Sequence, residues 1–227
     1  MKKNKRILFN EKRDRGLTGF FLYKLYGLHN KKIRKLVEKF LWYFLGKHFQ
    51  FYSRTIRKIL KKYHNVEVGH YSHGGCCVPG SMPPGTKVGK YCSIAVTVTV
   101  FTANHPTNIR SSHAFFFNPG LGHIIEDKIP YTHLTIGNDV WIGHNAVILP
   151  SCSSIGDGAV IGAGAIINKN IPPYAIVLGN PARVVRFRFS PEIIKQLLEE
   201  KWWDKEIDEI KKNIDDFIIP LEDEKVR

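Results

Sequence analysis

The chain has 227 residues, of which 43% are apolar and 24% are charged, a composition typical of an ordinary soluble protein. This length suffices for one sizeable hydrophobic core, or for one domain with an appendage. Only the charge is unusual, because 34 Lys and Arg against 20 Asp and Glu leave a formal net charge of +14. An excess of this size indicates nucleic acid, an anionic membrane surface or an acidic substrate as a partner.

The positive charge is confined to the N-terminal quarter of the chain. Residues 1–64 contain 19 Lys and Arg and 3 Asp and Glu, a net charge of +16. Residues 65–227 contain 15 basic and 17 acidic residues, a net charge of −2. No recognised nucleic-acid-binding motif accompanies the basic residues, so we expect no nucleic acid partner.

The sequence also bears on the compartment. The apolar run at residues 7–9 is too short for the core of a secretory signal. The best candidates for a membrane span end at Lys24 and Lys47, well short of the roughly 18–20 apolar residues that a transmembrane helix needs. The four cysteines form no Cys-x-x-Cys pair, and we interpret them as reduced thiols. We therefore expect a cytoplasmic protein that does not span a membrane.

Residues 1–64 are predicted to form a basic, amphipathic helical extension. From Lys31 onward, apolar residues recur at intervals of three and four, at Ile33, Leu36, Val37, Phe40, Leu41 and Phe44. Residues 53–63 repeat this character. Two interpretations remain open. The extension is a cap whose apolar face covers the next domain, or it attaches peripherally to the anionic inner face of a membrane.

Residues 65–187 are predicted to form a β-helix. An aliphatic residue followed by Gly recurs every six residues, as at Ile136, Ile142, Ile155 and Ile161. Each unit reads as a short strand and a turn, and three units close one triangular coil. The phase slips by one residue before Ile155, where we expect a bulge at a corner. Residues 104–133 lack the repeat and are predicted to leave the coil as an excursion loop.

Residues 188–227 are predicted to return to helix. Ser190 followed by Pro191 is typical of an N-cap and a first helical position. An apolar stripe follows, and the last stretch is rich in Asp and Glu.

Several segments together carry a family resemblance. They are Asn65-Val-Glu-Val-Gly-His-Tyr-Ser, Lys90-Tyr-Cys-Ser-Ile, Ala103-Asn-His-Pro, Ile136-Gly-Asn-Asp-Val-Trp-Ile-Gly, Gly179-Asn-Pro-Ala-Arg, and Ser190-Pro-Glu-Ile-Ile with Lys201-Trp-Trp-Asp. With them, residues 66–204 resemble the hexapeptide-repeat acyltransferases, and within these the xenobiotic or chloramphenicol-type O-acetyltransferases and their polysaccharide-modifying relatives. The resemblance implies a mainly β fold, a left-handed parallel β-helix. It also implies a homotrimer with active sites between subunits, acetyl-CoA as acyl donor, and no metal.

Acetyl transfer from a thioester to a hydroxyl needs a base, and a histidine that titrates near neutrality suits this task. His105 lies where the repeats stop, and its segment matches the family's catalytic histidine. The resemblance therefore implies that His105 is the general base. Asn104 and His113, in the same loop, are expected to bind the substrate, although a structural or solvated position is the alternative for each.

The resemblance also implies a set of residues that bind acetyl-CoA: Trp141, Gly143, His144, Ala163, Lys169, Arg183 and Arg186. Trp141 and Ala163 are expected beside the pantetheine arm, and the amides of Gly143 and His144 near the thioester. Cationic side chains suit the phosphates of the nucleotide. The alternatives are a corner aromatic that packs between coils for Trp141, and ordinary surface charges for the three basic residues.

The acceptor is less well defined by these patterns. Lys205 follows the Trp-Trp-Asp motif where the xenobiotic branch commonly has an aromatic residue, and the excursion loop looks more like that of saccharide-modifying members. We therefore predict transfer of an acetyl group to a hydroxyl of a sugar or of a cell-surface polysaccharide precursor. The alternative acceptor is a drug of the chloramphenicol or streptogramin type.

Two further alternatives change the class of protein. A zinc hydratase on the same scaffold would need convergent imidazoles such as His105, His113 and His144, whose spacing does not resemble the expected ligand set. The remaining alternative is a β-helix that only assembles and carries out no chemistry.

Overall fold

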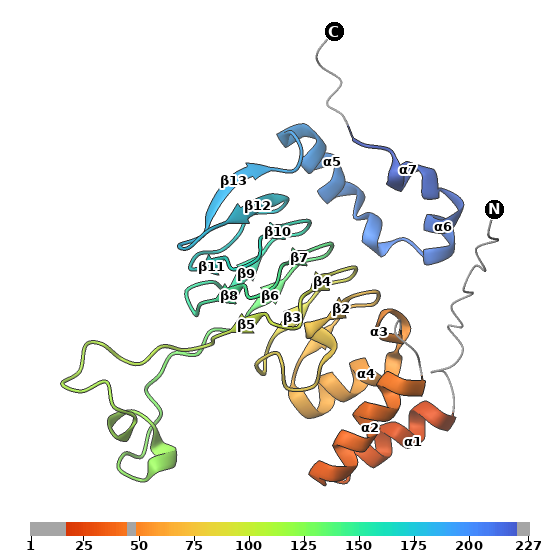
Figure 1. Ribbon diagram of the computed structural model, residues 1–227. Helices are drawn as coiled ribbons and strands as arrows, with labels where there is room; N and C mark the ends of the chain where they lie inside the picture. Colours follow the sequence, from red (N-terminus) through yellow and green to blue (C-terminus); the bar gives the residue numbers. More distant parts are fainter. Residues whose placement is uncertain (1–16, 45–48, 222–227) are drawn as a thin grey trace.

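The computed structural model describes residues 17–44 and 49–221. Three segments lie outside the described residues: 1–16, 45–48 and 222–227. The first contains several of the basic residues counted above, and the last contains part of the acidic C-terminal stretch. In chain order, a group of helices leads into a stack of short strands, a long loop leaves this stack, and further helices follow (Figure 1).

The strands form three sheets that the chain visits in turn. Sheet A contains β1 (Glu67–Val68), β3 (Lys87–Val88), β6 (Thr135–Ile136) and β9 (Ser154–Ile155). Sheet B contains β2 (His73–Gly74), β4 (Ser93–Ile94), β7 (Trp141–Ile142), β10 (Val160–Ile161), β12 (Ala175–Leu178) and β13 (Arg183–Phe187). Sheet C contains β5 (Thr99–Val100), β8 (Val147–Ile148) and β11 (Ile166–Ile167). All neighbouring strands are parallel except β12 and β13, so the chain winds as a parallel coil.

The six-residue repeat follows from this geometry. Each side of the coil is a two-residue strand, whose second residue points inward, followed by a four-residue turn. On sheet B, Ile94, Ile142 and Ile161 lie in register in successive coils, and none is more than 1% exposed. These aliphatic ladders are the hydrophobic core of the coil stack, and burying each such side chain stabilises it by about 1.5–3 kcal/mol.

The predicted slip in phase is taken up at a corner, as expected. Residues 149–153 join sheet C to sheet A with one residue more than the corresponding turn between sheets A and B. Ile136 and Ile155 nevertheless pair in register on sheet A. The extra residue therefore bulges outward at the corner and leaves the stack undisturbed.

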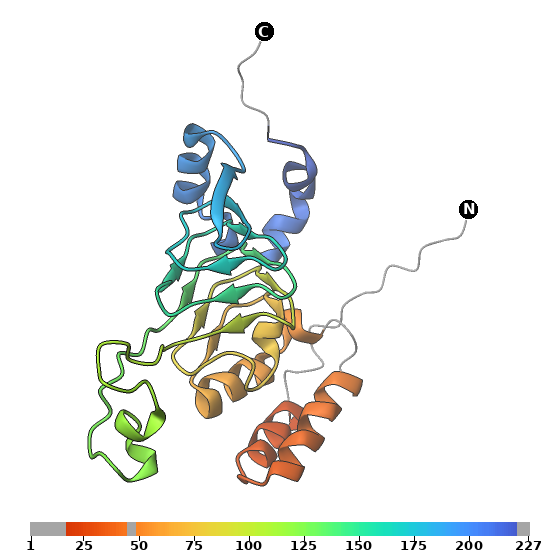
Figure 2. The same ribbon diagram turned by 60° about the vertical axis from the view of Figure 1, so that its left-hand side comes forward.

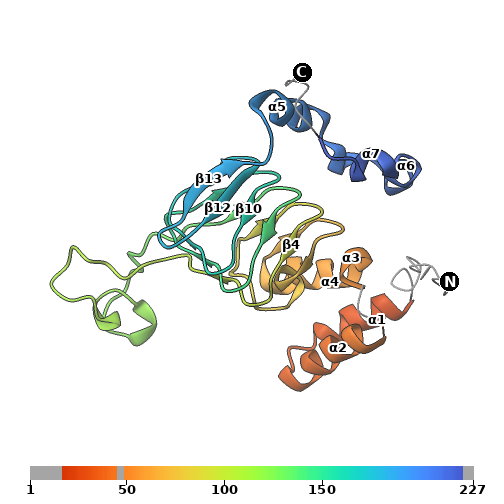
Figure 3. The ribbon, with the colours of Figure 1, turned by 45° about the horizontal axis from the view of Figure 1, so that its top comes forward.

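Helices cover the N-terminal end of the coil stack. They are α1 (Leu17–Tyr26), α2 (Lys31–Phe44), α3 (Phe49–Tyr52) and α4 (Arg54–Ile59), and a π-helical turn (Leu60–His64) continues the last of these. The Ser53 side chain caps α4 by accepting a hydrogen bond from Ile56 N. Buried Arg57 donates to the carbonyl oxygens of Gly69 and Ser72, which ties α4 to the first coil. Figure 3 shows α1 and α2 beyond α4, away from the strands.

The opposite end of the stack carries α5 (Pro191–Glu200). The chain then returns along the side of the coils through a 3-10 turn (Trp202–Asp204), α6 (Ile207–Lys212) and α7 (Ile214–Ile218), and Lys90 of an early coil pairs with Asp204 at 2.9 Å. The predicted start of α5 is confirmed, because the Ser190 hydroxyl accepts a hydrogen bond from Ile193 N and Pro191 is the first helical residue.

The loop between β5 and β6 projects away from the coils (Figures 1 and 2). It contains only two short 3-10 turns, Ala114–Phe116 and Pro119–Leu121, and a third such turn, Gly75–Cys77, follows β2. The four cysteines are buried, free thiols. Among residues 17–44 and 49–221, no helix has both the length and the apolar character needed to cross a bilayer.

Candidate active site

His105 lies near the start of the projecting loop, and its side chain is exposed. Its Nδ1 lies 2.9 Å from the carbonyl oxygen of Ser112. Because a carbonyl oxygen can only accept a hydrogen bond, Nδ1 must carry the proton of the neutral ring. The other ring nitrogen, Nε2, is then unprotonated, which is the state that a general base requires.

The loop folds back so that its first and middle parts meet at His105. The ring of buried Phe117 lies 4.8 Å from the His105 ring in an edge-on arrangement, which limits rotation of the imidazole. His113 follows the residue that binds His105, and its Nδ1 accepts a hydrogen bond from Phe115 N at 3.2 Å. Asn104 is exposed beside His105. The three loop residues predicted from the sequence therefore lie in one folded segment.

Four of the predicted acetyl-CoA residues gather where sheets B and C meet. Gly143 stacks on Ala163 in the next coil, and His144 O accepts a hydrogen bond from Gly164 N at 2.8 Å. A Cβ atom at Gly143 would lie 2.7 Å from Ala163 N, so this close approach requires glycine. Trp141 stands just before the turn and is 57% exposed, so it is available to a ligand and is not packed between coils.

The prediction for the Gly143 amide is wrong. Gly143 N donates to Ile161 O at 2.8 Å as part of the ladder that joins two coils. This N–H is therefore occupied and cannot stabilise a thioester or an oxyanion. What Gly143 contributes is the close spacing of the corner, since any side chain there would push the two turns apart.

Thr97 is a residue of this corner that the sequence analysis missed. Its Oγ1 accepts a hydrogen bond from Asn145 N at 2.9 Å and lies 3.1 Å from His144 Nδ1. The hydroxyl can donate to His144 Nδ1 or accept from it, so this contact holds the orientation of the His144 ring in either tautomer. No motif marks Thr97, because its partners come from the next coil, 47 and 48 positions away along the chain.

The three basic residues predicted for the phosphates do not share one position. Arg183 and Arg186 are exposed on β13, which extends sheet B as an antiparallel hairpin with β12. Lys169 is exposed in the turn that leads from β11 to sheet A, on the other side of sheet C.

Within one chain, therefore, the predicted residues lie in two separate groups, and we call each group a half-site. The half-site with His105 lies in the loop that leaves the corner between sheets C and A, and Figures 1 and 3 show this loop pointing away from the strands. The half-site with Trp141 and His144 lies at the corner between sheets B and C. Among the described residues, no three His, Cys, Asp or Glu side chains are grouped so that they could hold a metal ion.

Comparison with known proteins agrees with the repeat pattern. Residues 133–169 match the family model described as bacterial transferase hexapeptide (six repeats). The chain is 35% identical over 167 residues to a chloramphenicol acetyltransferase of Klebsiella aerogenes, a match that covers 65% of this chain and 79% of the relative. The chain belongs to the hexapeptide-repeat acetyltransferases.

Other members of the family extend this comparison. A chloramphenicol acetyltransferase of Agrobacterium fabrum is 42% identical over 122 residues, which cover 51% of this chain and 58% of that protein. The match thus spans less than two thirds of this relative. A protein of Lysinibacillus sphaericus named "Probable macrolide acetyltransferase" is 39% identical over 134 residues, 56% of this chain and 74% of the relative.

In this hexapeptide-repeat acetyltransferase, Arg188 fastens the β13 hairpin to the coil. Its Nη1 donates to Asp139 Oδ2 and to Gly158 O, both at 2.9 Å, and its guanidinium lies 5.3 Å from the centre of the Tyr174 ring. Burial raises the pKa of the Asp139 carboxyl, and the hydrogen bond from Arg188 opposes this effect. These contacts hold Arg188 between Asp139 and Tyr174, directly after the strand that carries Arg183 and Arg186.

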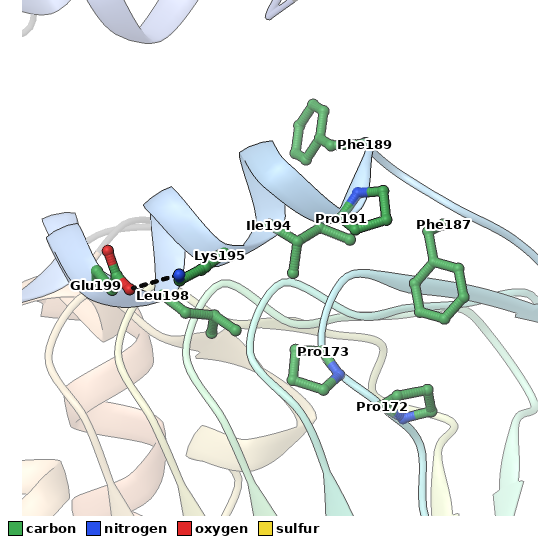
Figure 4. A pocket seen from close by; sticks show the side chains of 9 residues that line it. All are labelled: Pro172, Pro173, Phe187, Phe189, Pro191, Ile194, Lys195, Leu198 and Glu199. Carbon is green, nitrogen blue, oxygen red and sulfur yellow. Dashed lines mark ion pairs between the residues drawn. The ribbon is translucent and has the colours of Figure 1, made fainter. Parts of the chain in front are cut away.

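The protein also has an apolar groove of about 560 Å³ under α5 (Figure 4). Its lining comes from α5, β13 and the turn before β12, and consists of Pro172, Pro173, Phe187, Phe189, Pro191, Ile194, Lys195, Leu198 and Glu199. Lys195 and Glu199 pair with each other at its edge. None of the residues predicted to bind acetyl-CoA or the acceptor lines this groove.

Proposed function

We propose that this protein transfers the acetyl group of acetyl-CoA to a hydroxyl group, with His105 as general base. The observation that carries this proposal is the bond from His105 Nδ1 to Ser112 O, which leaves Nε2 unprotonated in an exposed, irregular loop. A positioned base of this kind contributes typically 10²–10⁴-fold to the rate.

The chemistry needs only one proton carrier. His105 Nε2 takes the proton of the acceptor hydroxyl as its oxygen attacks the thioester carbonyl carbon. The tetrahedral intermediate then expels the CoA thiolate, and the protonated imidazole returns its proton to this sulfur. The negative oxygen of the intermediate needs a donor, and we assign this role to the Nε2–H of His144, in the tautomer whose Nδ1 accepts a hydrogen bond from Thr97.

Acetyl-CoA would lie along the corner between sheets B and C. The exposed face of Trp141 offers an apolar surface to the pantetheine arm, and Ala163 leaves the backbone accessible. Arg183 and Arg186 are exposed on the adjoining hairpin and would meet the phosphates, because guanidinium groups bind phosphate oxygens in pairs. We propose Lys169 as a further phosphate contact from a neighbouring subunit.

A homotrimer of left-handed coils would join the two half-sites. His105 and Trp141 leave different corners of one coil, so a neighbouring chain must bring its loop to the corner. This proposal is tested with two inactive variants, His105→Ala and Ala163→Trp, which damage opposite half-sites. Mixed trimers of the two variants should regain activity, because one interface then pairs an intact loop with an intact corner. Mixed trimers that form but stay inactive would place the whole site in one chain.

For the acceptor, we propose a hydroxyl of a sugar or of a cell-surface polysaccharide precursor. Lys205 and the composition of the loop support this assignment. The second candidate is a drug, and the names of the chloramphenicol and macrolide relatives favour it. A screen that measures release of the CoA thiol separates the two, since turnover of a drug that equals turnover of the best glycan would favour the second.

The test of the central proposal is the variant His105→Ala. We expect turnover to fall by at least about 100-fold while the affinity for CoA stays near that of the wild type, because the base does not bind the donor. His123→Ala, in the same loop, is the matched control and should retain activity. Full activity in His105→Ala would refute the assignment.

We propose the cytoplasm as the compartment. Four buried thiols remain unpaired, which suits a reducing environment.

A further inference from the structure

Helix α1 has two apolar faces, and the other residues that the structure describes cover only one of them. Leu22 and Tyr26 are buried where α1 packs against α2 and α4. The opposite face carries large exposed apolar side chains at Leu17, Phe20, Phe21 and Leu25, and Leu28, also exposed, follows in the turn after the helix. We call these five residues the outer α1 face. Phe20 and Phe21 are 56% and 60% exposed.

This arrangement narrows the two hypotheses for the extension, which the sequence analysis applied to residues 1–64 as a whole. The clearest apolar stripe in the sequence follows Lys31 and lies on α2. In the structure Val37 and Leu41 of α2 are buried, and Ile33 and Phe40 pack against the core, so most of that apolar stripe is already covered. On α2, Leu36 and Trp42 remain exposed, at 66% and 40%, whereas α1 leaves a whole apolar face uncovered.

The surroundings of the outer α1 face are strongly basic. Lys24 lies on this face, with its Nζ 5.5 Å from the centre of the Phe20 ring. The neighbouring helix α2 adds exposed lysines, at positions 31, 32, 35 and 39. The one acidic residue between positions 17 and 44 is Glu38, which accepts a hydrogen bond from Tyr26 on the covered side.

We propose that the outer α1 face docks on an anionic lipid bilayer. A helix with large apolar residues on one side and lysines beside them lies in the plane of the interface, with the apolar side chains among the acyl chains and the lysines among the headgroups. The same charges argue against a second copy of this chain as the occupant. Two outer α1 faces in contact would bring two sets of lysines together and repel each other.

Docking through α1 also bears on which acceptor the enzyme would meet. Figures 1 and 2 show α1 and the loop that carries His105 on either side of the coils, both away from α5. Docking through α1 would hold the enzyme at the surface where lipid-attached glycans lie. This step rests on the proposed function, and it identifies the acceptor class as a glycan attached to a membrane lipid. The docking itself does not depend on the reaction.

The test measures binding of the full chain to lipid vesicles by flotation. One set of vesicles contains phosphatidylglycerol and phosphatidylcholine in equal parts, and the other contains phosphatidylcholine alone. We expect binding to the anionic set, and a decrease as salt is raised, because each lysine near an anionic surface contributes about fivefold to the affinity. The double variant Phe20→Ala, Phe21→Ala should bind about tenfold or more weakly, since it removes two aromatic rings from the buried face.

A matched control distinguishes binding through the outer α1 face from nonspecific hydrophobic binding. The double variant Ile218→Ala, Ile219→Ala removes two similarly exposed apolar side chains from the C-terminal helical segment and should bind vesicles as the wild type does. The four altered side chains are all exposed, so we expect circular dichroism and thermal unfolding to be unchanged in both variants. Absence of binding to anionic vesicles would overturn the proposal, as would equal binding by the Phe20, Phe21 variant. A wild-type oligomer that this variant dissociates, without any vesicle binding, would assign the face to a second copy.

Discussion

Gly143 provides a sharp test of the corner geometry. A Cβ atom at this position would lie 2.7 Å from Ala163 N, 3.0 Å from Ala163 Cα and 3.1 Å from Gly162 C. Ordinary contacts between such atoms are about 3.5–4.0 Å, so the variant Gly143→Ala must push two successive turns apart by several tenths of an ångström. All three neighbours are backbone atoms held by the ladder, and they cannot swing aside as a flexible side chain would.

Overpacking of this kind costs about 1–3 kcal/mol. We therefore expect urea to unfold Gly143→Ala at a lower concentration than the wild type, with an unchanged dependence on urea concentration. The displaced turn also carries His144, so the dissociation constant for CoA, measured by calorimetry, should rise about tenfold.

Gly120→Ala is the matched control for this experiment. Its new Cβ would meet only the end of the Asn118 side chain, so the free energy of unfolding should change by less than about 0.5 kcal/mol. If Gly143→Ala unfolds at the same urea concentration as the wild type and binds CoA equally well, the close stacking of the two turns described above is wrong.

Two further predictions concern the core of the coil stack. Ile161→Ala should lower the free energy of unfolding by about 2–5 kcal/mol, because Ile161 is fully buried and its neighbours in the adjacent coils cannot close the cavity; a loss below about 1 kcal/mol would contradict this core. Burial raises the pKa of the Cys92 thiol from 9.0 to about 12, so the folded state keeps a proton that the unfolded state loses above pH 9. Stability contributed by this group is thus complete below pH 9 and should fall by about 1.4 kcal/mol between pH 8 and pH 10, whereas Cys92→Ala should lack this part of the decline in urea unfolding.

Much of the coil could be predicted from the sequence. A period of six predicts which residues face the core and which face solvent. The aliphatic positions at Ile136, Ile142, Ile155 and Ile161 are all buried in the structure, as this period predicts. Ser190 likewise marks the start of α5, since an N-cap depends on residues three positions apart. These features are local, so the order of the residues is enough to specify them.

The candidate site could be predicted only in part. The sequence analysis named His105 and the corner residues through their motifs, but it could not show that the Gly143 amide is already used by Ile161 O. It also missed Thr97 and Arg188, because their partners lie in other coils and no spacing along the chain records such contacts.

The N-terminal extension shows most clearly which properties follow from the sequence and which depend on the tertiary structure. Its charge of +16 and its apolar periodicity follow from the sequence alone. Which apolar face is left uncovered depends on how α1, α2 and α4 pack, and this packing buries Leu41 of α2 while Phe20 and Phe21 of α1 remain exposed. An amphipathic pattern specifies that a helix has an apolar side, and only the tertiary structure decides whether the protein itself or a partner covers that side, because burial depends on contacts between distant parts of the chain.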